Sequence, residues 1–289
     1  MHTRPPSTID LGTDIPEDEM KALPGAILLA VVLVACSGGI QTATSDPDSV
    51  ASDLAERSPS HDVGLTYVAL GDSWVEGAHC GGCRTFAGLY ADGLETLTGE
   101  PVGFIDLTGD RTTDSTALLE SLRTDDEIRA AVADADVVLI ATGPNEGSVT
   151  TEPLAAGTCG GADNLDCIRA LGERWATNFD ASLEEIEQLR DGKPTAIRLV
   201  NAANILTSVP SIATELGLEE DFAAEAFALN FELLAQAVCD TADAHDAQCV
   251  DVRPIMNGPN LDKPTDENSP ENMQAIADAL VETGLPELP

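Results

Sequence analysis

The chain is poor in basic residues. Its 289 residues include only 14 Lys and Arg, of which three are lysines, against 51 Asp and Glu, for a formal net charge of -37 at pH 7. A surface this acidic repels DNA, RNA and anionic membranes. We therefore expect no nucleic-acid partner. The length and the 43% share of hydrophobic residues suffice for one sizeable α/β domain with a core of its own.

Histidine and the common cofactor motifs are also scarce. There are four histidines, and no strand-like segment is followed by the Gly-x-Gly-x-x-Gly pattern of dinucleotide-binding proteins. The segment Cys80-Gly81-Gly82-Cys83 is open to interpretation as half of a zinc site or as a redox motif, but no second CxxC accompanies it. The sequence therefore predicts no metal and no cofactor.

No hydrophobic run is long enough to span a bilayer comfortably. The longest, 22–35, has 14 residues, whereas a transmembrane helix needs about 20. It ends in Leu33-Val34-Ala35-Cys36, which resembles a bacterial lipoprotein signal. The alternative interpretations of this run are a plain signal peptide and a buried helix. We expect a signal segment over 1–35, with the true start at Met20 because the preceding residues are acidic.

The expected mature protein begins at a lipidated Cys36. Residues 36–62 are rich in Ser, Thr, Asp and Pro and read as a flexible tether. The domain itself would cover 63–289. This arrangement predicts an exported monomer that is held at the bacterial cell surface or the periplasmic face, with membrane contact through the lipid anchor alone.

Six further cysteines favour disulfides in an oxidising compartment. Their spacing favours three local pairs, namely Cys80 with Cys83, Cys159 with Cys167, and Cys239 with Cys249. Each pair would close a short loop, so it would stiffen that loop more than it stabilises the whole fold.

Strand and helix patterns alternate from residue 66 onward. Apolar, β-branched runs predict strands over 66–70, 102–107, 137–141, 196–200 and 249–252. Apolar residues three or four apart predict helices over 86–97, 118–122, 128–132, 167–190, 222–244 and 270–282. The alternation indicates a three-layer α/β/α fold with a doubly wound five-stranded parallel sheet. The stripe of Phe222, Phe227 and Phe231 is expected to pack in the core.

Polar residues follow three of the predicted strands. Gly71-Asp72-Ser73 follows the first strand, the segment 108–113 the second, and Thr142-Gly143-Pro144-Asn145-Glu146 the third. Because parallel strands end at the same edge of the sheet, these loops should converge. A serine hydroxyl beside backbone and carboxamide N–H donors is the arrangement that acyl transfer requires.

These motifs resemble the GDSL/SGNH hydrolase superfamily over roughly 64–286. Gly-Asp-Ser is matched at 71–73 and Gly-x-Asn at 143–145. The resemblance implies a flavodoxin-like fold, Ser73 as nucleophile, and an oxyanion hole built from the Ser73 backbone, Gly109 and Asn145. Asp110 or Arg111 are alternatives to Gly109 in this alignment.

The last family motif, Asp-x-x-His-Pro, is altered. The chain reads Asp266-Glu267-Asn268-Ser269-Pro270, so Asp266 would be the orienting carboxylate and Ser269 occupies the histidine's position. A serine cannot accept the nucleophile's proton at neutral pH, whereas Ser-Pro is a preferred start of a helix. His79 is the candidate to replace the missing histidine as the base, and Asp266 acting alone would be a weak base. His245 is expected near the surface at the end of a helix.

Two functions from different classes follow. The first is an exported, lipid-anchored serine esterase acting on a neutral carboxylic ester, either an acyl lipid or an acetylated glycan, with weak activity because Ser269 replaces the histidine. The second is a catalytically degenerate member of the superfamily that binds a glycan or an ester-like small molecule at the cell surface.

Overall fold

The computed structural model describes residues 64–77, 82–204, 209–261 and 269–285, which belong to one compact unit. Several sequence-based predictions fall outside these residues. They are the signal segment with its start at Met20, the lipidated Cys36 and its tether, His79, Cys80 and Asp266.

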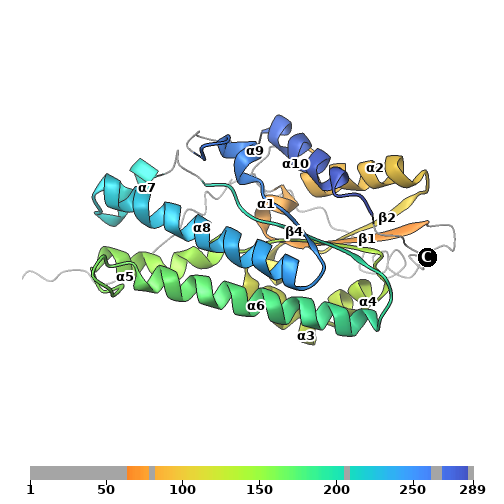
Figure 1. The fold of residues 1–289 in the computed structure, drawn as a ribbon, viewed down its shortest axis with the longest axis horizontal. Coiled ribbons are helices and arrows are strands. Elements are labelled where there is room, and N and C mark those ends of the chain that lie inside the picture. The colour runs from red at the N-terminus through yellow and green to blue at the C-terminus, as the bar shows by residue number, and fades with distance from the viewer. Residues whose placement is uncertain (1–63, 78–81, 205–208, 262–268, 286–289) are drawn as a thin grey trace, which may run out of the picture. The chain divides into compact units, whose positions relative to one another are not determined.

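A five-stranded parallel sheet forms the centre of the described fold (Figure 1). Its strands are β1 (Leu65–Gly71), β2 (Val102–Asp106), β3 (Val137–Ala141), β4 (Ala196–Val200) and β5 (Gln248–Val250), and their spatial order is β2-β1-β3-β4-β5. All four neighbouring pairs are parallel. The sequence-based prediction of the sheet is confirmed, with strand ends shifted by no more than two residues.

Helices cover both faces of the sheet, which gives the three predicted layers (Figure 1). One face carries α2 (Phe86–Thr98) and α10 (Pro270–Glu282), and the other carries α3 (Ser115–Thr124), α4 (Asp126–Asp134), α6 (Asp166–Arg190) and α8 (Glu220–Ala244). Successive side chains of β1 alternate between the layers, since Tyr67 and Ala69 pack under α2 while Val68 and Leu70 pack against α6 and α8.

Short helices follow the strands at the carboxyl edge of the sheet. They are α1 (Ser73–Glu76), η1 (Asp110–Thr112), η2 (Pro144–Thr150), α5 (Thr151–Ala155), α7 (Val209–Leu216) and α9 (Arg253–Asn257). None of these six helices is predicted by the sequence pattern, because one or two turns are too short to show a helical periodicity. They are the elements that shape the candidate site.

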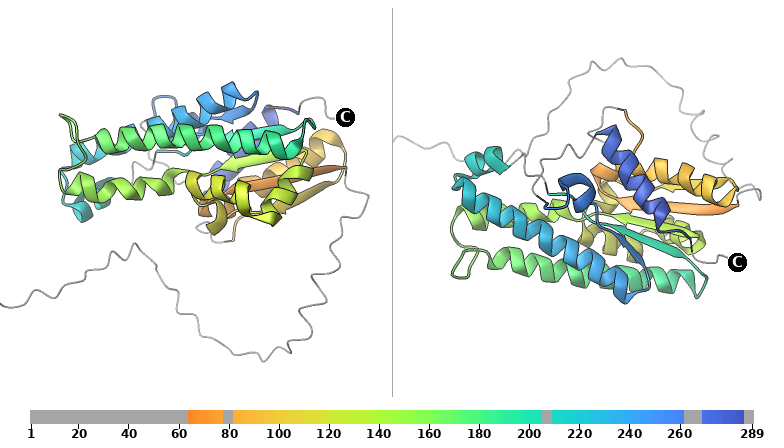
Figure 2. Two further views of the ribbon diagram at one scale, coloured as in Figure 1. Left: turned by 90° about the horizontal axis from the view of Figure 1, so that it is seen from below. Right: turned by 45° about the horizontal axis from the view of Figure 1, so that its top comes forward.

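The long helices α6 and α8 lie side by side and reach past the sheet (Figure 2). Near their starts they pack on each other through Ile168 of α6 and Ala226 of α8, together with Leu154 of α5, in a cluster separate from the sheet core. Among the described helices, α8 alone is long and apolar enough to cross a membrane by length and composition. Its buried positions pack against α6 and the sheet, as in a core helix of a soluble domain.

Two of the three predicted disulfides lie wholly within the described residues and are confirmed. Cys159, in the loop before α6, pairs with Cys167 in the first turn of α6, and Cys239 of α8 pairs with Cys249 of β5. Cys83 is also disulfide-bonded, while its predicted partner Cys80 lies outside the described residues.

Candidate active site

Ser73 begins the short helix α1 at the carboxyl end of β1, where the sequence places it. Asp72 caps this helix, because its Oδ1 atom accepts a hydrogen bond from the Trp74 backbone N–H at 3.0 Å. A side chain at Gly71 would come within 2.5 Å of the Ala141 carbonyl oxygen of β3. Glycine is thus required for the strand to turn sharply and present the half-buried Ser73 at the sheet edge.

The loop after β2 is tied to the Ser73 loop. The Gly109 N–H donates to the Gly71 carbonyl oxygen at 2.8 Å, and the Thr112 hydroxyl donates to the same oxygen at 2.7 Å. The predicted oxyanion role of Gly109 would therefore require its N–H to leave this partner, and that role stays a prediction.

Asn145 stands on the third loop, at the start of η2. Its Nδ2 atom donates to the Thr113 carbonyl oxygen at 2.9 Å, which ties the second loop to the third. The preceding Gly143 has a φ of 136°, and a side chain there would come within 2.7 Å of Leu234 on α8. The three loops therefore meet at one edge, as the parallel topology predicts.

Glu146 ties the loop after β3 to α3 and α6. This carboxylate is 6% exposed and accepts hydrogen bonds from the Trp175 indole N–H at 2.8 Å, from the Ser115 backbone N–H at 3.1 Å and from the Ser115 hydroxyl. Arg174 lies 3.6 Å away as a partly exposed ion-pair partner. The sequence motif includes Glu146 but predicts no role for it, and an acidic residue directly after Gly-x-Asn is the one signal that could have indicated this role.

Ser73 and Asn145 line one cavity of about 290 Å³. The wall is largely apolar, and its apolar lining residues are Trp74, Pro144, Leu154, Ile168, Ala202, Ala203, Leu216, Ala226, Phe227 and Phe231. The phenylalanines of α8 are expected from the sequence to pack in the core. Phe231 is buried in the core cluster and Phe227 packs partly buried against it, and both side chains also line the cavity. Asp72 is the one ionisable side chain among the described residues of the wall.

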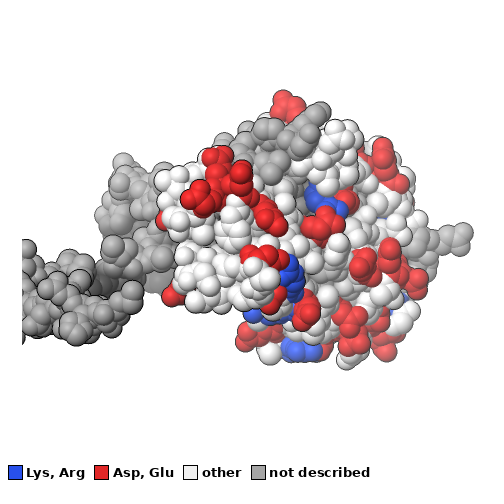
Figure 3. Space-filling model, turned by 60° about the vertical axis from the view of Figure 1, so that its left-hand side comes forward, with Lys and Arg blue, Asp and Glu red and all other residues white. Residues whose placement is uncertain are grey.

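The cavity differs sharply from the outer surface. On the face shown in Figure 3, Asp and Glu side chains far outnumber Lys and Arg. Because a charged group without a partner is costly to hold in an apolar wall, the cavity suits a neutral ligand.

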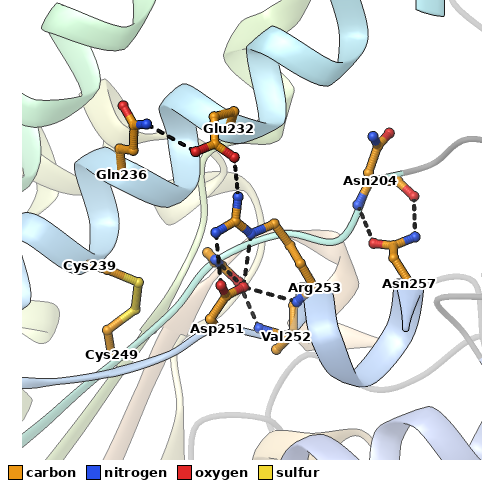
Figure 4. Close-up of polar contacts among 10 residues, drawn as sticks. Asn204, Glu232, Gln236, Cys239, Cys249, Asp251, Val252, Arg253 and Asn257 are labelled. Carbon is orange, nitrogen blue, oxygen red and sulfur yellow. Dashed lines mark hydrogen bonds and ion pairs between the residues drawn. A yellow bond between two sulfur atoms is a disulfide. The ribbon is translucent and has the colours of Figure 1, made fainter. Parts of the chain in front are cut away.

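A network of polar side chains fixes the segment after β4, which forms part of the cavity wall (Figure 4). The Asn201 carboxamide donates to Asp251 at 2.8 Å and accepts from the Val252 N–H at 2.9 Å. Arg253 donates through two nitrogens to Asp251 and through a third to Glu232 of α8. Burial alone would raise the pKa of Asp251, but the hydrogen bonds from Arg253 and Asn201 outweigh it and hold this pKa below its usual value.

The same wall is pinned at its other end. The Asn257 carboxamide accepts from the Asn204 N–H at 2.9 Å and donates to the Asn204 carbonyl oxygen at 2.8 Å (Figure 4). Ala202 and Ala203, which line the cavity, are thus held on both sides by bonds to the segment that follows β5.

Ser269 has the helix-start role that the sequence predicts. It is the N-cap of α10, and its Oγ atom accepts a hydrogen bond from the Asn272 N–H at 3.1 Å. Asp266 and His79, the other predicted members of the proton-transfer machinery, lie outside the described residues. Their placement relative to Ser73 therefore stays a prediction.

His245 is the single histidine within the described ranges, and it does not line the cavity. It ends α8, just before β5 begins, so it lies at the edge of the sheet opposite Ser73. Its ring bonds Glu187 at 2.8 Å and Asp180 at 2.9 Å. Burial lowers the pKa of His245, but the two carboxylates outweigh burial and raise it.

No cluster suited to a metal is found in the part of the chain that the structure describes. Nowhere in it do three or more His, Cys, Asp and Glu side chains gather as metal ligands.

The fold and this arrangement define a class, a parallel α/β protein with a serine exposed to a cavity at the carboxyl edge of its first strand. No family model and no curated protein matches the chain. Among solved structures, the lipase Lip_vut3 from a goat rumen metagenome is similar, with a TM-score of 0.60 and 19% identity, over 78% of this chain and 100% of that one.

A variant of Axe2, an acetyl-xylooligosaccharide esterase from Geobacillus stearothermophilus, is similar with a TM-score of 0.50 and 13% identity, over 78% of this chain and 97% of that one. These likenesses show the fold. The three-layer α/β fold that the sequence predicted is confirmed, and it is the fold that the resemblance of the motifs implies.

Proposed function

We propose that the protein is a serine ester hydrolase whose nucleophile is Ser73 and whose substrate is a neutral carboxylic ester. The observation that carries this proposal is the cavity shared by Ser73 and Asn145, whose inner wall is apolar and nearly free of charge. At roughly 30 Å³ for each water-sized group, the cavity has room for on the order of ten methylene groups. An apolar acyl chain fits such a wall better than an acetylated sugar, whose hydroxyls would need many polar partners.

The chemistry follows from the groups at the cavity mouth. The Ser73 Oγ atom attacks the ester carbonyl carbon, its proton passes to His79 as the proposed substitute base or to water, and the carbonyl oxygen becomes an oxyanion. The Ser73 backbone N–H and the Asn145 carboxamide would stabilise this charge. The alcohol leaves with a proton, and water then attacks the acyl-serine, which releases the acid and restores Ser73.

The activity is proposed to be weak. Efficient attack by Ser73 needs a base, and the hydroxyl of Ser269 cannot serve as one near neutral pH. Asp266 is assigned the role of orienting carboxylate, and His79 that of a substitute base. In serine proteases that lack a triad member, the oxyanion hole and binding still leave about 10³- to 10⁴-fold catalysis over water.

A second candidate function is favoured by the bond that Ser269 makes. Its Oγ atom accepts from the Asn272 N–H, which is a structural role that a catalytic histidine would not have. In this alternative the protein binds an ester-like ligand or a glycan in the same cavity without turning it over.

We also propose that the protein is exported and lipid-anchored through Cys36. The disulfides Cys159–Cys167 and Cys239–Cys249 support an oxidising compartment. Mass spectrometry of the protein from membranes of the expressing bacterium would test the anchor by the mass of a diacylglyceryl group on Cys36.

The esterase is tested by a fluorophosphonate probe together with hydrolysis of p-nitrophenyl butyrate. We expect slow labelling and slow hydrolysis that are both lost in Ser73→Ala. Ser148→Ala is the matched control, because Ser148 lines the same cavity but donates its hydroxyl to the Asn145 carbonyl oxygen at 2.9 Å. If Ser73→Ala hydrolyses the ester as fast as the wild type, the nucleophile assignment is wrong.

A further inference from the structure

The end of β1, just before Ser73, extends beyond the end of its neighbour β2. The register of these two strands stops at Ala69, which lies opposite Asp106 of β2, and the Leu107 N–H then donates to the Ala69 carbonyl oxygen at 3.0 Å. Alternate residues of a strand direct their backbone N–H and C=O to the same neighbour, so Gly71 faces the side of β2 as Ala69 does. In the described sheet, β2 has no residue opposite Gly71.

The hydroxyl of Thr112 takes the place of the missing strand. Its Oγ1 atom donates to the Gly71 carbonyl oxygen at 2.7 Å and accepts from the Gly71 N–H at 3.1 Å. The same atom lies 3.2 Å from the Leu107 carbonyl oxygen, and Thr112 is fully buried. The Thr112 backbone is fixed as well, because its carbonyl oxygen accepts from the Thr142 hydroxyl at 2.8 Å. This one residue therefore joins the loops after β1, β2 and β3.

The Gly71 carbonyl oxygen has a second donor, the Gly109 N–H, at 2.8 Å. A carbonyl oxygen can accept two hydrogen bonds, so both donors are accommodated. If the Gly109 N–H turns to a substrate oxyanion, as the sequence motif predicts, the Gly71 oxygen keeps the Thr112 hydroxyl. A buried oxygen that retains one partner avoids the penalty of a fully unpaired one. Thr112 therefore lowers the free-energy cost of recruiting Gly109 to the reaction.

We propose, building on the esterase function above, that Thr112 is a positioning residue for the reaction of Ser73. Its hydroxyl holds Gly71, two residues before Ser73, and keeps the Gly71 oxygen paired while the Gly109 N–H serves the oxyanion. Thr112 does not line the cavity, so it acts through these backbone groups and not on the substrate. A misplacement of a reacting group by about 1 Å can cost about 100-fold in rate, so a small relaxation of Gly71 should be measurable.

The test separates kcat from KM for p-nitrophenyl butyrate hydrolysis by the full chain. Thr112→Val removes the hydroxyl and keeps the shape of the side chain. We expect kcat to fall by about 10- to 100-fold and KM to stay within about 2-fold, because the cavity wall is unchanged. Thr112→Ser retains the hydroxyl and should keep kcat within about 3-fold of the wild type. All rates are measured well below the thermal midpoint of each protein, where a loss of stability alone leaves kcat unchanged.

Thr283→Val is the matched control. The Thr283 hydroxyl also makes two hydrogen bonds, since it accepts from Arg198 Nε at 2.6 Å and donates to the Leu280 carbonyl oxygen at 2.6 Å, but it does not line the cavity. Its loss should lower the thermal midpoint and leave kcat unchanged. If Thr112→Val fails to fold, Thr112→Ala removes the hydroxyl with a smaller side chain and is compared with Thr112→Ser in the same way.

The inference is overturned if Thr112→Val matches the wild type in kcat, if its loss appears in KM, or if Thr112→Ser or Thr283→Val loses as much kcat. Failure of both Thr112→Val and Thr112→Ala to fold would also overturn it, because Thr112 would then determine the fold and not the rate. These outcomes leave the esterase assignment standing, since the wild type still hydrolyses the ester through Ser73. If the wild type shows no Ser73-dependent hydrolysis or labelling, the proposed function itself is wrong and the positioning role is overturned with it.

Discussion

The two halves of the candidate site differ in how far they keep the family pattern. The loops after β1, β2 and β3 are tied together by bonds among Gly71, Gly109, Thr113 and Asn145, and they present Ser73 to a cavity. The start of α10 has Ser269 where the family pattern has histidine, and this serine caps the helix. The comparison indicates that the loops carrying Ser73 and Asn145 keep the motifs, whereas the start of α10 has lost its histidine.

Restoring a histidine at position 269 should have the largest effect, which we expect on the rate of ester hydrolysis. We expect Ser269→His to raise Ser73-dependent hydrolysis of p-nitrophenyl butyrate by about 10²- to 10⁴-fold, the usual contribution of a positioned base. The loss of the N-cap bond should cost about 1 kcal/mol of folding stability. Initial rates and urea unfolding of the same preparations measure both effects.

Ser269→Ala is the control for that substitution, because it removes the N-cap bond without supplying a base. It should lose similar stability and gain no activity. A folded Ser269→His protein that is as slow as the wild type would show that the loops after β1 to β3 have also diverged, and it would favour the binding module.

Removing the Glu146 carboxylate, which holds the loop after β3, should have the next largest effect. Glu146→Ala leaves the Trp175 indole N–H and the Ser115 N–H buried without their acceptor. We expect a loss of about 3 kcal/mol in the free energy of unfolding, since several buried donors lose their partner at once. Urea denaturation measures this loss, and any Ser73-dependent hydrolysis should fall with it.

Glu152→Ala is the matched control, because Glu152 is an exposed glutamate of the neighbouring helix α5. Its substitution should stay within about 0.5 kcal/mol of the wild type. If the two substitutions cost the same, the Glu146 network does not hold the third loop in the way the structure indicates.

The smallest effect, a change in thermal stability, is expected for His245, which lies at the edge of the sheet opposite Ser73. Because its two carboxylate partners raise the pKa of His245 in the folded state, the charged ring stabilises the fold below the unfolded pKa, and this contribution is lost as pH rises through the folded pKa. The difference in thermal midpoint between wild type and His245→Gln should thus be largest in mildly acidic buffer and shrink toward alkaline pH. Ester binding should not change, and a midpoint difference that grows with pH would contradict this account.

Much of the fold could be predicted from the sequence. The prediction for β3 matches the structure to the residue, because a fully buried parallel strand reads as an uninterrupted apolar run. The prediction for β4 matches equally well, although Arg198 interrupts its apolar run. The helix 270–282 was placed equally well, since Ser269 and Pro270 mark its start. Short elements such as η2 and α5 were missed because one or two helical turns carry no detectable period.

The candidate site was only partly predictable. Ser73 and Asn145 were found because each stands in a short motif directly after a strand. Asn230 was missed because it stands inside a long apolar helix, more than eighty residues away from Asn145, and its place in the cavity wall is visible only once α8 is packed against η2. Glu146 was read as part of a motif, and its role depends on Trp175 of α6.

The amino-acid sequence by itself determined the layered α/β fold, the local disulfides and the helix-capping role of Ser269, because periodicity, short spacing and capping act between residues that are close in the chain. Tertiary structure alone decided that the loops bond to one another, that Phe227 and Asn230 share a cavity with Ser73, and that Gly109 already has a hydrogen-bond partner. These features arise from contacts between segments that lie far apart in the chain, which no local pattern encodes.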